Sequence, residues 1–422
     1  MNMNNKEIKR IWFASHYSMP PEYEMRNKTE MYCKYLMKKG IECKIFCAST
    51  VHNHDVNVVE DGKLYVEKNY DGIDFVHIRC NKYKGNGLKR IINMRQYAHR
   101  FHKVAKNFDL PDVIVADTNI LMYGPIYKFC EKHGIAFVSE IRDIYPLAFV
   151  VYLGYSEKNP FIKYCYHLEK KMFMRSDAIS YSFPGGKQYM IDKGWQNDVN
   201  LEKIFYINNG VDLPSFNKNV QDFDYKDEDL DNPNLIKVVY TGSLRIVNRI
   251  ELLIGAARIL KERHADNIKI LIWGTGEDVE RLIDMSKDLD NIKFKGFVQK
   301  QWVPSISSKA DINLMHNFST KMNRYGQNQC KLFDYLAAGN PILSTYKVGF
   351  STIEENNCGY QIENQTSEEI ANEILRIANM PENERKQMGE NAKEAAKQFD
   401  FAYLTDLLYD CCKYAFEHKH SK

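Results

Sequence analysis

The sequence lacks long apolar runs, paired cysteine motifs and a strong excess of either charge. Its longest mostly apolar stretch, residues 145–155, contains a proline and a glycine and falls well short of the roughly 20 residues that a membrane-spanning helix needs. The ten cysteines include no C-x-x-C pair, and the first residues have no signal-peptide layout. We therefore expect a cytoplasmic protein with reduced thiols and no zinc site. The net charge of +3 points to no particular class of partner.

Short-period repeats and low-complexity tracts are also absent from the sequence. At 422 residues the chain is too long for one hydrophobic core, so we expect two domains. Strand-like and helical segments alternate in both halves, which predicts an α/β fold with parallel sheets covered on both faces. An acidic stretch, 217–235, is interpreted as the linker between domains at 1–216 and 236–399. The predicted strands are 8–15, 43–48, 75–80, 112–116, 136–140, 178–182, 204–207, 236–240, 268–273, 292–294, 312–315 and 341–344.

The most informative stretch is residues 324–343, which read RYGQNQCKLFDYLAAGNPIL. Asn328 is a good N-cap and Gly339 a good left-handed C′ residue, so the pattern predicts a helix between them. A glycine-bearing loop that opens a helix can bind an anion at the free N–H groups. Lys331 in the first turn and Asp334 further along suit a diphosphate and a ribose diol, respectively. These residues are equally compatible with an ordinary amphipathic helix whose Lys331 and Asp334 are solvated.

This stretch resembles the nucleotide-sugar helix of glycosyltransferase family four, whose members are retaining enzymes with the GT-B fold. It is most similar to the branch with the signature YG-SPNK-LFDYMAAGKPI, which includes bacterial N-acetylhexosamine and fucosamine transferases of surface-polysaccharide synthesis. The resemblance implies two Rossmann-like domains facing a cleft, with the last helix, 400–422, returning to the first domain. It also implies that Asp334 holds the ribose hydroxyls. The residues implied to hold the diphosphate and sugar are Gly326, Gln327, Asn328 and Gln329.

This stretch also departs from the family pattern. Many members carry a glutamate where this chain has Gly326, and the loop reads NQCK instead of SPNK. The resemblance therefore supports donor binding more firmly than it supports any one donor sugar.

Other strand-end loops carry the same resemblance. Residues 209–212 read NGVD and match the segment that closes the first domain in this family, although a plain turn explains them as well. Gly274 belongs to a G-x-G that follows the second strand of the donor domain. Gly296, Phe297 and Val298 match the loop that reads the nucleotide base in relatives. Taken alone, a G-x-G is usually a turn, and Phe297 would more often be a core residue.

A basic pair that clasps the diphosphate in many members is missing from this chain. The first donor-domain strand runs into Gly242, and the positions of the pair are occupied by Ser243 and Asn248. Arg245 and Arg249 are close enough in sequence to substitute, because guanidinium groups pair with phosphate in bidentate fashion. The alternative is that both arginines are surface helix residues.

The acceptor side is indicated by residues 139–146, SEIRDIYP, which resemble the E-[IL]-R-D-L-W-P signature of the same branch. Arg142 occupies the position of a catalytic-site histidine in other members. We expect Asp143 to orient Arg142 or an acceptor hydroxyl, and Glu140 and Arg26 to contact the acceptor. A purely structural ion pair is the competing interpretation.

The resemblance implies a retaining transfer without metal or other cofactor. The donor would be a UDP-linked, N-acetylated hexosamine, and the acceptor a saccharide or lipid-linked saccharide. The Asp-x-Asp triplets at 229–231 and 288–290 lie in the linker and at a helix end, so neither is expected to bind manganese. Catalysis would be mainly electrostatic, with Lys331, Arg245 and helix amides meeting the charge of the departing diphosphate. Two rivals share the architecture: a UDP-sugar 2-epimerase and a non-catalytic nucleotide-sugar-binding protein.

Residues 81–108 contain eight Lys or Arg and no acid. The apolar residues among them fall on one helical face, so this helix can either lie on anionic lipid or pack into a core with a solvated basic back. Peripheral contact with the inner face of a membrane is therefore one expectation. Nucleic acid is not expected, because the patch has no interleaved stacking platform. The residues of the apolar face are Leu88, Ile91, Met94, Ala98, Phe101, Ala105 and Phe108.

Overall fold

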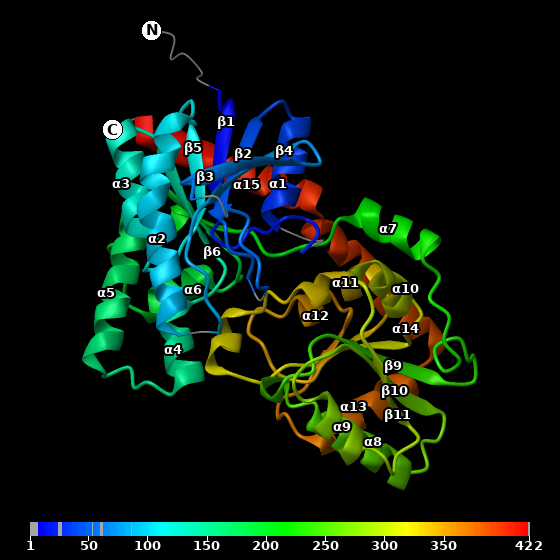
Figure 1. Cartoon of the computed structure of the whole chain (residues 1–422). Coiled ribbons are helices and arrows are strands. Elements are labelled where there is room, and N and C mark those ends of the chain that lie inside the picture. Colours follow the sequence, from blue (N-terminus) through cyan, green and yellow to red (C-terminus); the bar gives the residue numbers. More distant parts are fainter. Residues whose placement is uncertain (1–6, 24–27, 53, 60–61, 86, 421–422) are drawn as a thin grey trace. The chain divides into compact units, whose positions relative to one another are not determined.

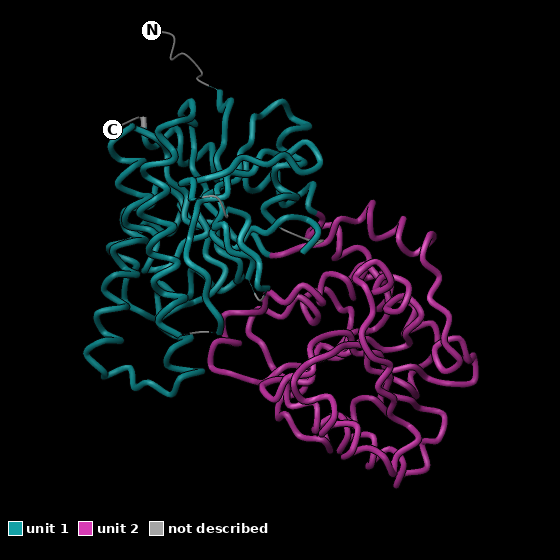
Figure 2. Tube along the Cα trace, viewed as in Figure 1, with its two compact units in different colours: residues 1–208, 401–422 teal, residues 209–400 magenta. Residues whose placement is uncertain are grey.

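The computed structural model describes residues 7–23, 28–52, 54–59, 62–85 and 87–420, and the chain forms two compact units (Figure 2). Unit 1 combines residues 1–208 with 401–422, and unit 2 is the continuous segment 209–400. The predicted end of the first domain, residue 216, instead lies inside helix α7 (Leu213–Asp222) of unit 2. The side chain of Phe216 is buried in a cluster of unit 2, which explains why the division comes earlier.

The predicted linker, 217–235, is also part of unit 2. Its acidic side chains are held by lysines of the second sheet and of a helix beside it. Asp229 forms ion pairs with Lys269 at 2.6 Å and with Lys295 at 2.7 Å, while Asp231 pairs with Lys309 at 2.7 Å. Acid-rich composition alone could not reveal these partners, which are distant in sequence.

Unit 1 contains an eight-stranded sheet with the order β3-β4-β2-β1-β5-β6-β7-β8. All neighbouring strands are parallel except β3 and β4, which form an antiparallel edge. The strands are β1 (Arg10–Ala14), β2 (Glu42–Ala48), β3 (Tyr65–Tyr70), β4 (Ile73–Ile78), β5 (Val113–Asp117), β6 (Ala136–Ile141), β7 (Ala178–Tyr181) and β8 (Ile204–Tyr206).

Helices cover both faces of this sheet because alternate strand residues are apolar on each side (Figure 1). Ile11 and Phe13 of β1 face α1 (Lys28–Lys38) and α15 (Phe401–His420), whereas Trp12 and Ala14 face α2 (Leu88–Val104) and α3 (Tyr123–His133). The last helix thus completes the core of unit 1. The remaining helices of this unit are α4 (Tyr145–Leu153), α5 (Pro160–Arg175) and α6 (Gly186–Asp192).

Unit 2 contains a six-stranded sheet, all parallel, with the order β11-β10-β9-β12-β13-β14. Its strands are β9 (Ile236–Thr241), β10 (Ile268–Trp273), β11 (Ile292–Gly296), β12 (Ile312–Met315), β13 (Ile342–Ser344) and β14 (Gly359–Gln361). Its helices beyond α7 are α8 (Glu251–Glu262), α9 (Val279–Met285), α10 (Val303–Ser308), α11 (Cys330–Ala338), α12 (Thr352–Glu355), α13 (Ser367–Ala378) and α14 (Glu382–Ala396).

The apolar face predicted for residues 81–108 lies mostly inside unit 1. Met94, Ala98 and Phe101 of α2 are buried against the first sheet, so that part of the helix packs into the core and cannot face lipid. Only its first turns keep large apolar side chains outside, with Leu88 77% and Ile92 50% exposed. Among the described residues, no helix is long and apolar enough to cross a membrane.

Candidate functional site

In unit 2, the loops that follow β9 and β10 pack backbone against backbone. The amide of Gly242 donates to the Trp273 carbonyl at 2.9 Å. A methyl group on Gly274 would overlap the Gly242 carbonyl oxygen, and one on Gly276 would overlap the Leu244 carbonyl oxygen. Only glycine permits this approach. Residues 273–276, which read WGTG and are called the WGTG motif below, therefore fix the two loops at the carboxyl ends of adjacent parallel strands, where ligands bind in such sheets.

The two residues in place of the missing basic pair bind each other. The Asn248 side-chain amide donates to the Ser243 carbonyl at 2.6 Å and to its Oγ at 2.9 Å. Arg245 is exposed, whereas Arg249 has a left-handed backbone, φ 54°, and lies 3.8 Å from Glu251. At this loop the site therefore has a neutral, hydrogen-bonded pair of side chains in place of two basic ones, with two arginines beside it.

Lys331 reaches into this loop from the first turn of α11. Its Nζ lies 4.0 Å from the centre of the Tyr240 ring and so close to Gly242 that a Cβ there would overlap it. The Tyr240 hydroxyl in turn donates to the Ser243 carbonyl at 3.2 Å. Burial lowers the pKa of Lys331 to about 7, and among the described residues no carboxylate forms an ion pair with it. When protonated, the Lys331 amine is therefore a buried cation without a counter-ion among the described residues.

The mouth of α11 differs from the sequence prediction in one respect. Gln329, not Asn328, is the N-cap, because Asn328 belongs to an extended loop whose carbonyl accepts from the Asn209 amide at 2.6 Å. The Gln327 side chain is buried and accepts from the Tyr346 hydroxyl at 3.1 Å. The buried Oε1 of Gln329 has no hydrogen-bond partner among the described residues. Hydrogen bonds to Asn328 and Gln327 thus hold the Gly326–Gln329 loop in place. Its Gln329 Oε1 is left as an acceptor without a donor among the described residues.

Asp334 lies on the second turn of α11 and is 7% exposed. The next residue, Tyr335, ties this helix to β9, because its hydroxyl accepts from the Thr241 amide at 2.9 Å. The predicted end of the helix is confirmed: Gly339 is the left-handed C-cap, with φ 75°. Lys331 and Asp334 therefore lie on a helix that is fixed at its end and against the sheet.

The loop predicted to read the base lies beside the same strands. The Gly274 amide donates to the Gly296 carbonyl at 2.8 Å, which joins this loop to the one after β10. Phe297 is 71% exposed and is not a core residue, whereas Val298 packs against a buried cluster. The Phe297 ring is therefore accessible for stacking.

Sequence reasoning missed His316, which directly follows β12. The ring is buried, with Nδ1 2.6 Å from Thr345 Oγ1 and Nε2 3.1 Å from the Arg249 carbonyl oxygen. Since a carbonyl only accepts, Nε2 carries the proton and the Thr345 hydroxyl donates to Nδ1. Burial lowers the pKa of His316 to about 4, so it is neutral. His316 thereby holds Arg249 in its left-handed conformation, and its position after a strand was the available signal.

In unit 1, Arg142 is held by acids other than the predicted one. Its Nη2 donates to Glu140 at 2.8 Å and to Thr29 at 2.9 Å, and Nη1 lies 3.8 Å from Asp117. Asp143 is exposed, and among the described residues it forms no hydrogen bond or ion pair with Arg142, which is oriented by Glu140 and Asp117 instead. The alternative expectation, that Asp143 orients an acceptor hydroxyl, stays a prediction. The reason is geometric, because Glu140 and Asp117 close adjacent parallel strands.

Glu140 is buried between two cations. Lys28, at the start of α1, lies 3.1 Å from Oε1, while Arg142 binds Oε2. Burial raises the pKa of Glu140, but the charges of Arg142 and Lys28 outweigh it and lower the value to about 2. With 2% exposure, Glu140 positions Arg142 and is not presented to an acceptor as expected. The other expected acceptor contact, Arg26, lies outside the described residues.

Asp117 was not singled out from the sequence. Burial raises its pKa to about 6 although the Arg142 charge opposes this, so the carboxyl titrates near neutrality.

Among the described residues, no group of three or more His, Cys, Asp or Glu side chains is arranged to hold a metal ion.

Comparison with known proteins agrees with this geometry. Residues 222–395 match the sequence family described as Glycosyl transferases group 1. The chain is 25% identical over 232 residues to an uncharacterized glycosyltransferase, MJ1069, of Methanocaldococcus jannaschii. That similarity covers 54% of this chain and 56% of the relative, so the chain spans little more than half the relative's length.

Solved structures resemble most of the chain. A sucrose-phosphate synthase from Thermosynechococcus elongatus has 14% identity and a TM-score of 0.68, covering 95% of this chain and 98% of that one. Anabaena Alr3699/HepE in complex with UDP has 13% identity and a TM-score of 0.64 over the same shares. The glycosyltransferase WaaG, involved in lipopolysaccharide biosynthesis, has 15% identity and a TM-score of 0.62, again over 95% and 98%. The predicted GT-B fold is therefore confirmed.

Proposed function

We propose that the protein is a retaining glycosyltransferase that moves a sugar from a nucleotide diphosphate sugar to a saccharide or lipid-linked saccharide. We further propose a UDP-linked, N-acetylated hexosamine as donor and bacterial surface-polysaccharide synthesis as the setting. The family match over residues 222–395 and the resemblance of the 324–343 motif support the reaction class. The UDP complex of the structurally similar HepE supports the base.

The observation that carries the proposal is the uncompensated amine of Lys331. A buried cation without a counter-ion is unfavourable unless a ligand supplies negative charge. The amine lies at the glycine-lined loop after β9 and next to the N-terminus of α11, whose first N–H groups also favour an anion. A diphosphate bound there would receive its positive charge from Lys331, which explains how the site can work with Ser243 and Asn248 in place of a basic pair.

The other donor contacts follow from this placement. Asp334, on the next turn of α11, would accept hydrogen bonds from the ribose diol. Gln329 Oε1, which has no donor among the described residues, would accept a hydrogen bond from a sugar hydroxyl. The exposed ring of Phe297 would stack on the base. Together these contacts recognise a nucleotide sugar rather than a simple anion.

In the proposed mechanism, the protein stabilises the charge that develops on the departing diphosphate. Lys331, the helix amides and Arg245 or Arg249 would carry this stabilisation. The diphosphate would take the proton of the acceptor hydroxyl on the same face of the sugar, so configuration is retained. Positive charge at this site comes from side chains and amides, and we expect transfer to proceed in EDTA.

On the acceptor side, we propose that Arg142 contacts the acceptor while Glu140 positions it. A lipid-linked acceptor would bring the protein to the cytoplasmic face of a membrane. The exposed Leu88, Ile91 and Ile92, beside the basic residues of α2, would then contact anionic lipid. Co-sedimentation with vesicles that contain or lack phosphatidylglycerol would measure this contact.

The testing experiment combines binding and turnover. A thermal-shift series with UDP, GDP, ADP and their sugars should show the largest stabilisation with UDP and a UDP-N-acetylhexosamine. Release of UDP should then depend on an added acceptor. Conversion of UDP-N-acetylglucosamine without acceptor would instead show an epimerase. Binding of UDP without release in the presence of any acceptor would show a non-catalytic binder, and a clear preference for GDP would contradict the proposed donor.

A further inference from the structure

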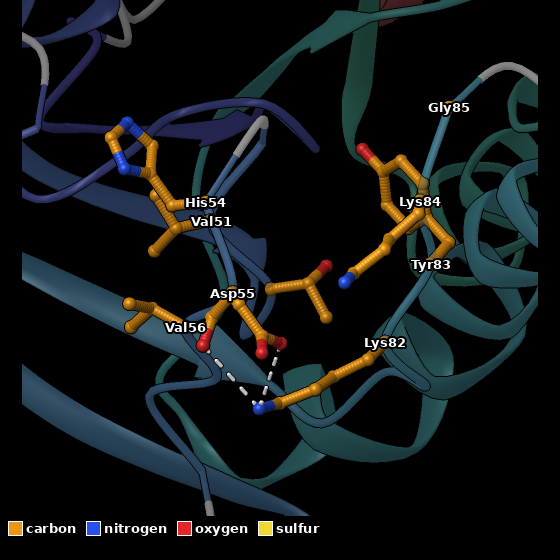
Figure 3. Close-up of a pocket in the computed structure, with 9 residues that line it drawn as sticks. Val51, His54, Asp55, Val56, Lys82, Tyr83, Lys84 and Gly85 are labelled. Atoms are coloured by element: carbon orange, nitrogen blue, oxygen red, sulfur yellow. Dashed lines mark hydrogen bonds and ion pairs between the residues drawn. The ribbon is translucent and has the colours of Figure 1, made fainter.

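A cavity lies in unit 1, at the carboxyl ends of β2 and β4 (Figure 3). Its volume of about 380 Å³ falls in the range of about 300–1,000 Å³ that is usual for small-molecule sites. The cavity is formed by the loop after β2 and the loop between β4 and α2. Its lining residues are Thr50, Val51, His54, Asp55, Val56, Lys82, Tyr83, Lys84 and Gly85.

The walls of this cavity are held by a buried asparagine of α2. The Asn93 amide donates to Thr50 Oγ1 at 3.0 Å and to the Asn81 carbonyl at 2.7 Å. Its Oδ1 lies 2.6 Å from Nε2 of the buried His16, in the loop after β1. One side chain thus joins the loops after three strands. Contacts within the protein therefore fix Thr50 in the cavity wall and Asn81 at the start of the second loop.

Two ring side chains line the cavity, Tyr83 and His54, and each contacts a further ring outside the lining. The Tyr83 hydroxyl lies 2.7 Å from His52 Nδ1, and the His54 ring is 5.0 Å from the ring of Tyr23. Flat rings together with a few fixed polar groups are typical of sites that bind small molecules.

The charges of the cavity are unbalanced toward the positive. Lys82 pairs with Asp55 at 3.2 Å. Figure 3 shows the Lys84 amine directed into the cavity, and among the described residues this amine has no ion-pair partner. Burial lowers the pKa of His52, and the nearby positive charges of Arg90 and His54 lower it further. A ligand with negative charge would compensate this local excess.

We propose that this cavity binds an anionic group, a carboxylate or a phosphate, carried by a saccharide, with Lys84 as its main counter-charge. The description of that saccharide as the acceptor rests on the proposed transferase function. The binding itself does not, because all the residues concerned lie in unit 1, whereas the nucleotide site lies in unit 2. The inference narrows the acceptor class to acidic or phosphorylated sugars.

The test measures binding of glucose, glucuronate, glucose 6-phosphate and inorganic phosphate to the full chain by ligand-observed NMR. Both anionic sugars should bind at least tenfold more tightly than glucose, and their ratio would identify the preferred anion. Lys84→Glu should weaken them at least tenfold. Lys163→Glu, an exposed lysine of α5, makes the same change in net charge and should weaken neither.

Equal binding of glucose and glucuronate, or unchanged binding in Lys84→Glu, would overturn the inference. Phosphate binding as tight as glucose 6-phosphate would overturn the saccharide part of it. In the wild-type chain, glucuronate should slow hydrogen exchange of residues 49–58 and 80–85. If glucuronate leaves exchange in these residues unchanged, the result also counts against the inference. UDP binding by the same protein reports separately on the proposed function, since Lys84→Glu should leave it unchanged.

Discussion

The amine of Lys331 lies 4.0 Å from the centre of the Tyr240 ring, at a place where the chain supplies no carboxylate among its described residues. The ring face offers a cation only a modest attraction, about 0.5–2 kcal/mol. It does not offset the loss of water around a buried ammonium group. Without a ligand, the environment of Lys331 beside Tyr240 therefore disfavours the charged form of its amine. A bound anion would favour that charged form.

Replacing Lys331 by methionine should weaken UDP binding and turnover by about 10- to 100-fold, because charge-assisted hydrogen bonds contribute about 1.5–3 kcal/mol. The thermal stability of the free protein should hold or rise, since a buried amine is removed. Lys287→Met, at an exposed position of the same unit, serves as the control and should bind normally. Steady-state kinetics with Lys331→Met at the wild-type level would show that another cation binds the diphosphate.

Binding of UDP should take up a proton above neutral pH. The lowered pKa of Lys331, about 7, leaves the amine mostly neutral at pH 8, and a bound diphosphate raises that pKa again. UDP affinity should therefore fall as pH rises above 7. For folding, the sign is the opposite: the unfolded chain binds this proton more tightly, so Lys331 makes the free protein gain stability as pH rises from about 7 toward 10.5.

Titration calorimetry at pH 8 in buffers of different ionisation enthalpy would measure this uptake. The proton uptake that accompanies UDP binding should disappear in Lys331→Met. An observed enthalpy that is the same in all buffers would contradict the assignment of Lys331 to the diphosphate.

Replacing Asp334 by asparagine should raise the Kd for UDP by about tenfold or more, because a charged acceptor for the ribose diol is lost. The specific readout is the comparison of UDP with 2′,3′-dideoxy-UDP. The wild type should discriminate between them, and Asp334→Asn should discriminate much less. If the variant keeps the full discrimination, the ribose lies elsewhere.

Replacing His316 by alanine should weaken UDP binding through Arg249, whose carbonyl oxygen it holds. The double variant with Arg249→Ala should then bind hardly more weakly than either single variant, because both changes remove one contribution. His316→Asn, which keeps a donor, should restore part of the affinity. Strictly additive losses would show that His316 supports only the fold.

Replacing Gly274 by alanine should lower both the melting temperature and UDP binding, because the new methyl group would overlap the Gly242 carbonyl oxygen. Gly296→Ala is the matched control. It also has a left-handed backbone, φ 79°, but its methyl group would enter open space, so only the backbone cost of about 1–2 kcal/mol remains. Thermal unfolding of both variants tests this, and a larger loss for Gly296→Ala would contradict the packing argument.

Much of the fold could be predicted from the sequence because parallel strands are buried on both faces and read as apolar segments. Strands β10 and β12 have the predicted bounds, and the other predicted strands differ by one or two residues at an end. The edge strand β3 was missed because Lys68 and its neighbours are exposed and give no apolar pattern. Helix α7 was missed because Phe216 is its one buried residue, while Leu213 and Val220 pack against the same cluster only partly buried.

The candidate site could be predicted where its residues are close together in the sequence, so that a local pattern indicates their role. Lys331 and Asp334 share a helix, and the glycines of the WGTG motif are required by close approach. Partners that come from distant segments were not predictable. No local pattern indicates that Asn248 binds Ser243, that His316 holds Arg249, or that Lys28 joins Glu140 across more than a hundred residues.

The position of α15 has a consequence for the order of folding during synthesis. Its buried residues, including Phe401, Leu404 and Leu408, cover one face of the unit 1 sheet. Unit 2 is continuous from 209 to 400, so it can form its core while α15, which unit 1 needs for its own core, is still being synthesised. Unit 1 therefore begins synthesis first but completes its core last, because one apolar face of its sheet stays uncovered until α15 is available.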